Sequence, residues 1–92
     1  MEATGPINQG IGKGRIYVSN RDSNNVSVID ENTNIVMATV TVGTNPQGIG
    51  MNLVTNRIYV ANTISSNISV IDGNTNTVIA TVGVGVGPFG VV

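Results

Sequence analysis

The sequence contains no cysteine and no histidine. Disulfides, thiolate nucleophiles, imidazole bases and zinc sites built from those side chains are therefore excluded. The acids available for catalysis are Glu2, Asp22, Asp30, Glu31 and Asp72. Asp30 and Asp72 occupy equivalent places in a repeat, so they are expected to lie one repeat apart and not to face each other as an acid/base pair. We expect no enzyme activity, no catalytic residues and no cofactor or metal site.

Charged residues are also scarce, at 10%, and the net charge is −1. Four scattered lysines and arginines do not form the basic surface that binding to phosphate backbones requires, so no nucleic-acid partner is expected. No apolar run approaches the roughly 18–20 residues of a membrane span. The opening MEATGPINQG lacks the basic start and apolar centre of a signal peptide.

Aromatic residues make up only 3% of the chain, namely Tyr17, Tyr59 and Phe89. The core must therefore consist of valine and isoleucine, which pack well on pleated sheets and lose rotamer freedom in helices. Twelve glycines and many asparagines supply turns, and no 3.6-residue apolar pattern is long enough for a helix. The 92 residues are predicted to form one all-β domain, 1–92.

The chain repeats itself. RIYVSN at 15–20 returns as RIYVAN at 57–62, and more than half of the positions in 15–50 are identical to their counterparts in 57–92. Repeats of 20–50 residues are typical of solenoids, propellers and other arrays.

Each repeat contains four strand-like segments, which in the second copy are 47–53, 57–62, 67–72 and 77–82. Four short strands with polar turns form an antiparallel meander of the size of one propeller blade. We therefore predict two four-stranded blades, at 5–42 and 46–84, with 87–92 as the truncated start of a further strand. The first strand of blade one is placed at 8–12, and a two-layer sandwich is the alternative architecture.

The strands carry apolar residues on both faces. In RIYVAN, Ile58 and Val60 point to one side, and Tyr59 and Ala61 to the other. A sheet stacked between two others can bury both faces, whereas a free-standing sheet needs one polar face. Glycines at 48 and 50, and at 10 and 12 in the first copy, fit a strand near a crowded central axis, where backbones approach closely.

The pattern RIYV[SA]N…N[VI]SVID…NTN…ATV…VG…P…G resembles the YVTN β-propeller repeat of archaeal surface-layer-type proteins. The match covers nearly the whole chain and recurs at one period. It departs from the name-giving motif at the third position, where Ser19 and Ala61 stand. The resemblance implies a propeller fold and an extracellular or cell-surface location. Relatives of this kind carry many blades in one chain.

Two motifs have both a structural and a functional interpretation. The segments 30–34 and 72–76 read D-x-N-x-N, the opening of a calcium loop, but neither continues with the loop's glycine and distal glutamate, so hairpin turns are favoured over a weak cation site. Asn25 and Asn67 begin glycosylation sequons, which a duplicated repeat would copy without selection for sugar and which matter only if the chain is exported. The glycine-rich stretches 10–14 and 83–88 fit no phosphate-binding loop and are interpreted as linkers.

Two functions remain open. The first is a structural or interaction module, in which blades from several copies close into a ring and present loops to a protein or glycan partner. The second is a ligand-binding or catalytic ring with a site on its central axis. The first is favoured because the two copies are nearly alike, whereas a ligand site needs unlike residues from different blades. Two blades per chain allow a ring of four, six or eight blades; a homotrimer is expected first and a tetramer second.

Overall fold

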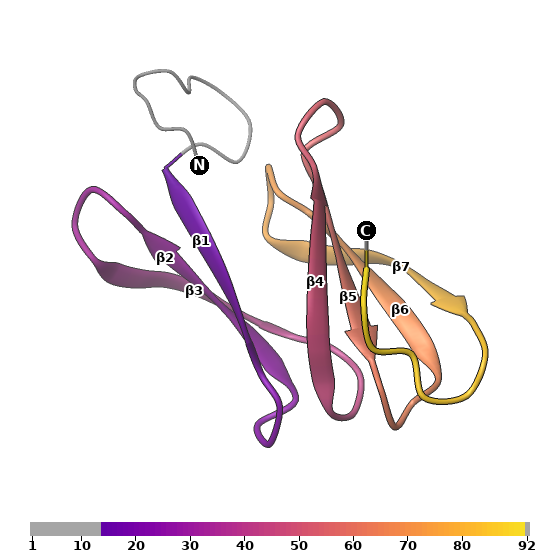
Figure 1. Ribbon diagram of the computed structural model, residues 1–92. Coiled ribbons are helices and arrows are strands. Elements are labelled where there is room, and N and C mark those ends of the chain that lie inside the picture. The colour runs from indigo at the N-terminus through magenta and orange to yellow at the C-terminus, as the bar shows by residue number, and fades with distance from the viewer. Residues whose placement is uncertain (1–13, 92) are drawn as a thin grey trace.

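The computed structural model describes residues 14–91. This part of the chain consists of seven strands joined by turns (Figure 1), and it contains no helix long and apolar enough to cross a membrane. The strands are β1 (Arg15–Asn20), β2 (Asn25–Asp30), β3 (Ile35–Thr41), β4 (Pro46–Asn52), β5 (Arg57–Asn62), β6 (Asn67–Asp72) and β7 (Thr77–Gly83).

The strands form two antiparallel meanders, β1-β2-β3 and β4-β5-β6-β7. The predicted four strands are present in the second sheet. The first sheet has three among the described residues and not the predicted four, because the predicted strand at 8–12 lies outside them. The strands predicted at 57–62 and 67–72 have those bounds.

Asparagine makes most of the hairpin turns possible. Asn24, Asn34, Asn56 and Asn76 each close a turn with φ between 57° and 60°. Asparagine tolerates this left-handed region better than other non-glycine residues because its short amide bonds locally. The many asparagines thus end the strands at regular intervals, and the short turns that they form pair each strand with the next one in its sheet.

The register assigns each side chain to one face of its sheet, since directly paired residues share a face. In the first sheet, Tyr17 pairs with Val28, and Ile16 pairs with Ile29. In the second sheet, Ile58 pairs with Ile71. Each pairing extends across three strands and defines one face. In the first sheet, the Tyr17 face comprises Tyr17, Ser19, Val26, Val28, Ala38 and Val40, and the Ile16 face comprises Ile16, Val18, Ser27, Ile29, Val36 and Thr39. In the second sheet, the Ile58 face comprises Ile58, Val60, Ser69, Ile71, Val78 and Thr81, and the Tyr59 face comprises Tyr59, Ala61, Ile68, Val70, Ala80 and Val82.

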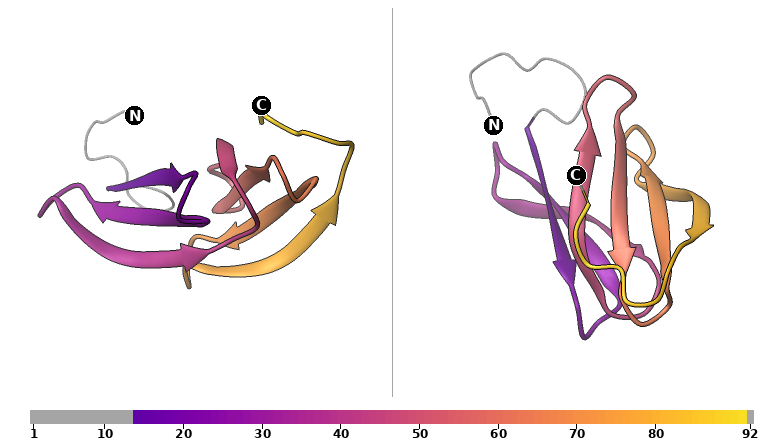
Figure 2. Two further views of the ribbon diagram at one scale, coloured as in Figure 1. Left: turned by 90° about the horizontal axis from the view of Figure 1, so that it is seen from below. Right: turned by 45° about the vertical axis from the view of Figure 1, so that its right-hand side comes forward.

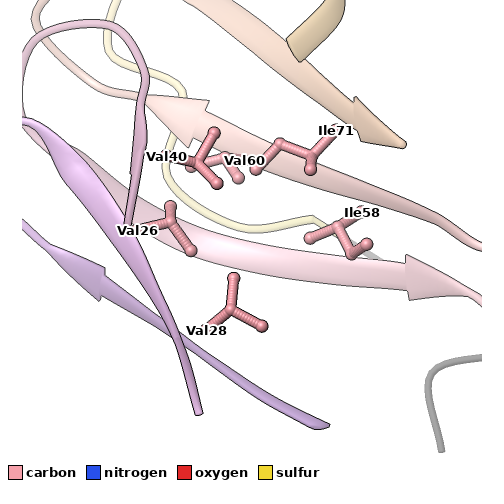
Figure 3. Close-up of a cluster of buried hydrophobic side chains, with 6 residues drawn as sticks. All are labelled: Val26, Val28, Val40, Ile58, Val60 and Ile71. Atoms are coloured by element: carbon pink, nitrogen blue, oxygen red, sulfur yellow. The ribbon is translucent and has the colours of Figure 1, made fainter. Parts of the chain in front are cut away.

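The core lies between the two sheets, where the Tyr17 face packs against the Ile58 face. Figure 3 shows its centre, in which valines of the first sheet meet Ile58, Val60 and Ile71 of the second. Tyr17, Ala38, Val42 and Ile49 pack around this cluster. Burying a Val or Ile side chain contributes about 1.5–3 kcal/mol, so this cluster is the main apolar contribution to the stability of the pair.

After β7 the chain turns back across the second sheet (Figures 1 and 2). There the backbone of Phe89 lies against Gly48, and a Cβ on Gly50 would come within 2.6 Å of Cγ1 of Val91. The Thr63 hydroxyl donates to the carbonyl of Pro88 at 2.8 Å. A close backbone approach is therefore present at Gly48, and it is made by the C-terminal tail, residues 88–91; Gly10 and Gly12 lie outside the described residues.

Candidate interaction surface

The two D-x-N-x-N segments form hairpin turns, as predicted. Asp30 Oδ1 accepts a hydrogen bond from the backbone amide of Asn32 at 2.9 Å, and Asp72 Oδ1 accepts one from Asn74 at 2.8 Å. Each aspartate thus holds its own turn, which is the bonding expected of an Asx turn. Within residues 14–91, no group of three or more acids gathers where it could hold a metal ion.

The two sequon asparagines take part in matching hydrogen-bond triads. In the first sheet, Asn20 Nδ2 donates to Asn25 Oδ1 and to Ser27 Oγ, both at 2.8 Å. In the second sheet, Asn62 Nδ2 donates at the same distance to the equivalent residues, Asn67 and Ser69. The two repeats therefore share a side-chain hydrogen-bond network as well as a sequence pattern. The two copies differ in burial: Asn62 is fully buried in the joint between the two sheets, whereas Asn20 is half-buried at the open side of the first sheet.

Three hydrogen bonds run from β1 across the joint between the sheets. Arg15 Nη1 donates to the carbonyl of Gly73 at 2.6 Å. The hydroxyl of Tyr17 donates to Asn76 Oδ1 at 3.5 Å, and Ser19 Oγ donates to the carbonyl of Gln47 at 2.7 Å. These bonds fix how the two apolar faces are aligned, which apolar packing alone does not specify.

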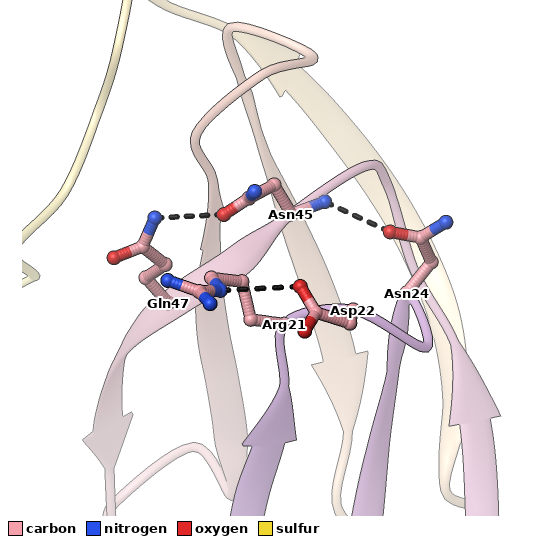
Figure 4. Close-up of polar contacts among 5 residues, drawn as sticks. All are labelled: Arg21, Asp22, Asn24, Asn45 and Gln47. Carbon is pink, nitrogen blue, oxygen red and sulfur yellow. Dashed lines mark hydrogen bonds and ion pairs between the residues drawn. The ribbon is translucent and has the colours of Figure 1, made fainter.

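A second polar group joins the β1–β2 turn to the β3–β4 connection (Figure 4). The backbone amide of Asn45 donates to Asn24 Oδ1 at 2.9 Å, and Gln47 Nε2 donates to Asn45 Oδ1 at 2.7 Å. The ion pair between Arg21 and Asp22, at 3.3 Å, is exposed and adjacent in sequence. Exposed pairs of this kind contribute about 0–1 kcal/mol, so the amides and not the charges hold this end of the molecule.

One hollow has a volume of about 540 Å³. It lies between the end of β1, the start of β4 and the tail, and it is lined by Ser19, Arg21, Pro46, Gln47, Gly48 and Phe89. Arg21 is the one charged residue of this lining, and its guanidinium pairs with Asp22 beside the hollow. The hollow offers contacts for a ligand but no acid/base pair.

The larger open features are the two outer sheet faces. Ile16, Val18 and Val36 on the Ile16 face are 46%, 39% and 52% exposed. On the Tyr59 face, Ala61 and Val70 are buried, and Val82 is 49% exposed. Contiguous apolar surface on a small protein marks a site of contact with another molecule. Sequence reasoning anticipated apolar residues on both faces, and the register now shows which residues each open face contains.

The chain matches no family model. It is 50% identical over 42 residues to a PE-PGRS family protein of Mycobacterium tuberculosis, PE_PGRS18, a match that covers 46% of this chain and 9% of that protein. Among solved structures it is similar to hydrazine synthase of Kuenenia stuttgartiensis (27% identity, TM-score 0.81, 85% of this chain and 22% of the other). It is also similar to apo AztD from Citrobacter koseri (23% identity, TM-score 0.74, 86% and 22%).

The chain thus spans 22% of each of these two structures and 9% of the curated relative. Both structural neighbours are propeller-type folds. The seven described strands, their two antiparallel meanders and the apolar packing between them agree with neighbouring blades of such a fold. The chain is an all-β protein of propeller type.

Proposed function

We propose that this chain is a structural or interaction module, a pair of propeller blades that assembles with further copies into a ring. The ring presents its turns to a protein or glycan partner and catalyses no reaction. The YVTN-like repeat pattern supports this proposal and an extracellular or cell-surface location. It also supports a proposed assignment of the chain to the YVTN β-propeller repeat family.

The observation that carries the proposal is that each sheet has two apolar faces and leaves large apolar side chains of its outer face exposed. The Tyr17 face and the Ile58 face cover each other, while the Ile16 face keeps large side chains at 39–52% exposure. A contact that buries the exposed apolar side chains contributes about 25 cal/mol for each Å² removed from water. Head-to-tail contacts between such faces close into rings when the rotation per unit permits.

Light scattering coupled to size-exclusion chromatography tests the proposal. Across a dilution series, the mass is expected to reach three times the 9.5 kDa of one chain, or four times if eight blades close the ring. Any closed assembly of two or more chains supports the module. A mass of one chain at every concentration would overturn the proposal.

The hollow of about 540 Å³ favours a second candidate, a ring that binds a ligand near its axis. Arg21 and the amide of Gln47 would suit an anionic or hydroxylated small molecule. Arg21→Ala should then abolish ligand binding in isothermal titration against a panel of carboxylates and sugars, while assembly stays intact.

A further inference from the structure

The two open faces are repeat copies of the two faces that already pack against each other. Shifting the Ile16 face by 42 positions gives the Ile58 face, and all six residues are identical between them. Shifting the Tyr17 face gives the Tyr59 face, which differs only where Ser19 and Val26 become Ala61 and Ile68. The open surface of the first sheet is therefore, in side chains and in register, the surface that the second sheet buries in the joint.

From this correspondence we infer that the Ile16 face docks onto the Tyr59 face of a second copy of this chain, in the geometry of the joint inside one chain. The inference rests on the proposed function and specifies its contact: a head-to-tail joint between unlike faces, in which the occupant of each open face is another copy.

The polar bonds of the internal joint have equivalents that a second copy would complete. Arg15 donates to the carbonyl of Gly73; the equivalent donor, Arg57, is exposed and would reach the carbonyl of the second copy's Glu31. Tyr17 donates to Asn76; Tyr59 would donate to the second copy's Asn34. The joint between copies also places the Glu31 carboxylate near Arg57, a charge pair that the internal joint lacks because Gly73 has no side chain.

One glycine shows that the open face is shaped for this contact. A Cβ on Gly43 would lie 2.7 Å from Cγ of Asn62, so the internal joint has room only for glycine at this point. Its repeat equivalent, Gly85, has nothing within 4 Å in the single chain. In the joint between copies, Gly85 would lie over the second copy's Asn20, whose bonds to Asn25 and Ser27 are already formed.

Two aspartate variants, one on each open face, test the inference. Both substituted residues are about half exposed, so Ile16→Asp and Val82→Asp should leave the β-sheet circular dichroism of the chain unchanged. Each variant alone is expected to fall to the mass of one chain. An equimolar mixture should give a species of two chains, because one intact Ile16 face and one intact Tyr59 face remain.

The two-chain species in the mixture requires that the joint be made by two different faces, the Ile16 face of one copy and the Tyr59 face of the other. If Val82→Asp alone assembles like the wild type, the joint is not made by the Tyr59 face, and the inference is wrong. It is equally wrong if Ile16→Asp alone assembles, or if both variants stay folded and their mixture remains at the mass of one chain.

A gentler pair of variants tests the same joint should either aspartate unfold the chain. Gly85→Ala is expected to weaken assembly at least tenfold, because its Cβ would press on the second copy's Asn20 as a Cβ on Gly43 would press on Asn62. Gly83→Ala is the matched control: it also has nothing within 4 Å, and its repeat equivalent, Thr41, already carries a side chain. Equal assembly of the two variants would overturn the inference. A wild-type chain that never assembles defeats the proposed function as well, whereas an assembling wild type with unaffected variants defeats only this joint.

Discussion

Gly73 and Asn56 form a close pair of one small and one large residue, and in the first repeat the sizes are reversed, with Glu31 in place of Gly73 and Gly14 in place of Asn56. In the second sheet, the amide of Gly73 donates to the carbonyl of Asn56 at 2.8 Å, and the Asn56 side chain fills the place where a Cβ of Gly73 would stand. In the first sheet, Glu31 donates to Gly14 at the same 2.8 Å, with the large and the small residue reversed. The backbone bond is kept in both blades, and only one residue of each pair carries a side chain there.

This exchange predicts a compensating pair of substitutions. Gly73→Ala should lower the free energy of unfolding by about 1–3 kcal/mol, because the new methyl group overpacks against the buried Asn56. Adding Asn56→Gly should recover most of that loss, since φ at Asn56 is 57° and glycine adopts it freely. Urea denaturation of both single variants and the double variant measures the coupling. Strictly additive effects would contradict the packing explanation.

The two isoleucines at equivalent places in the repeat should respond differently to truncation. Ile58 is fully buried, so Ile58→Ala is expected to cost about 2–5 kcal/mol of unfolding free energy. Ile16 is 46% exposed, so Ile16→Ala should cost much less in samples dilute enough to keep chains apart. Denaturation at low micromolar concentration separates the two effects. Equal losses would mean that both faces are buried within one chain.

Calcium should leave the melting temperature unchanged, because Asp30 and Asp72 already bond the amides of their own turns. A site specific to the folded state would stabilise it by about 2.7 kcal/mol at a hundredfold excess of calcium over its dissociation constant. Differential scanning fluorimetry with and without millimolar calcium checks this. A clear rise in melting temperature would show that the cation interpretation is right and that the turns rearrange to bind the ion.

The sequence predicts most of the strands because the alternation of apolar residues and the asparagine turns recur together. It does not predict the bulges between Val28 and Ile29 and between Val70 and Ile71. Each places one extra residue, Met37 or Ile79, in the outermost strand, and no glycine or proline marks them. The pairing of faces also needed the structure, since the period of two shows that residues alternate but not which side meets the other sheet.

The C-terminal tail makes a contact within its own chain that the sequence does not predict. The sequence indicates that residues 87–92 have no vacant place within their own chain. In the structure, the Phe89 backbone lies on Gly48 and the Val91 side chain lies on Gly50, because two glycines in β4 leave room for another segment. The tail joins no strand there, so its lack of a strand position within its own chain stays a prediction. That the tail also spans the joint between copies stays a prediction.

Deleting residues 87–92 tests that prediction. The tail repeats the start of β4, which pairs with β5, and β1 is the repeat equivalent of β5. At a head-to-tail joint the tail would therefore lie near the second copy's β1 and its predicted strand at 8–12, where Phe89, 66% exposed in the single chain, could be covered. Burial of one such side chain is worth about 1.5–3 kcal/mol, so the truncated chain should dissociate at roughly ten- to a hundredfold higher concentration. Its β-sheet circular dichroism per chain should stay the same. Phe89→Ala in the full chain is the narrower variant and should reproduce most of the loss. Unchanged stoichiometry and unchanged concentration dependence in both variants would show that the tail only covers β4 of its own chain.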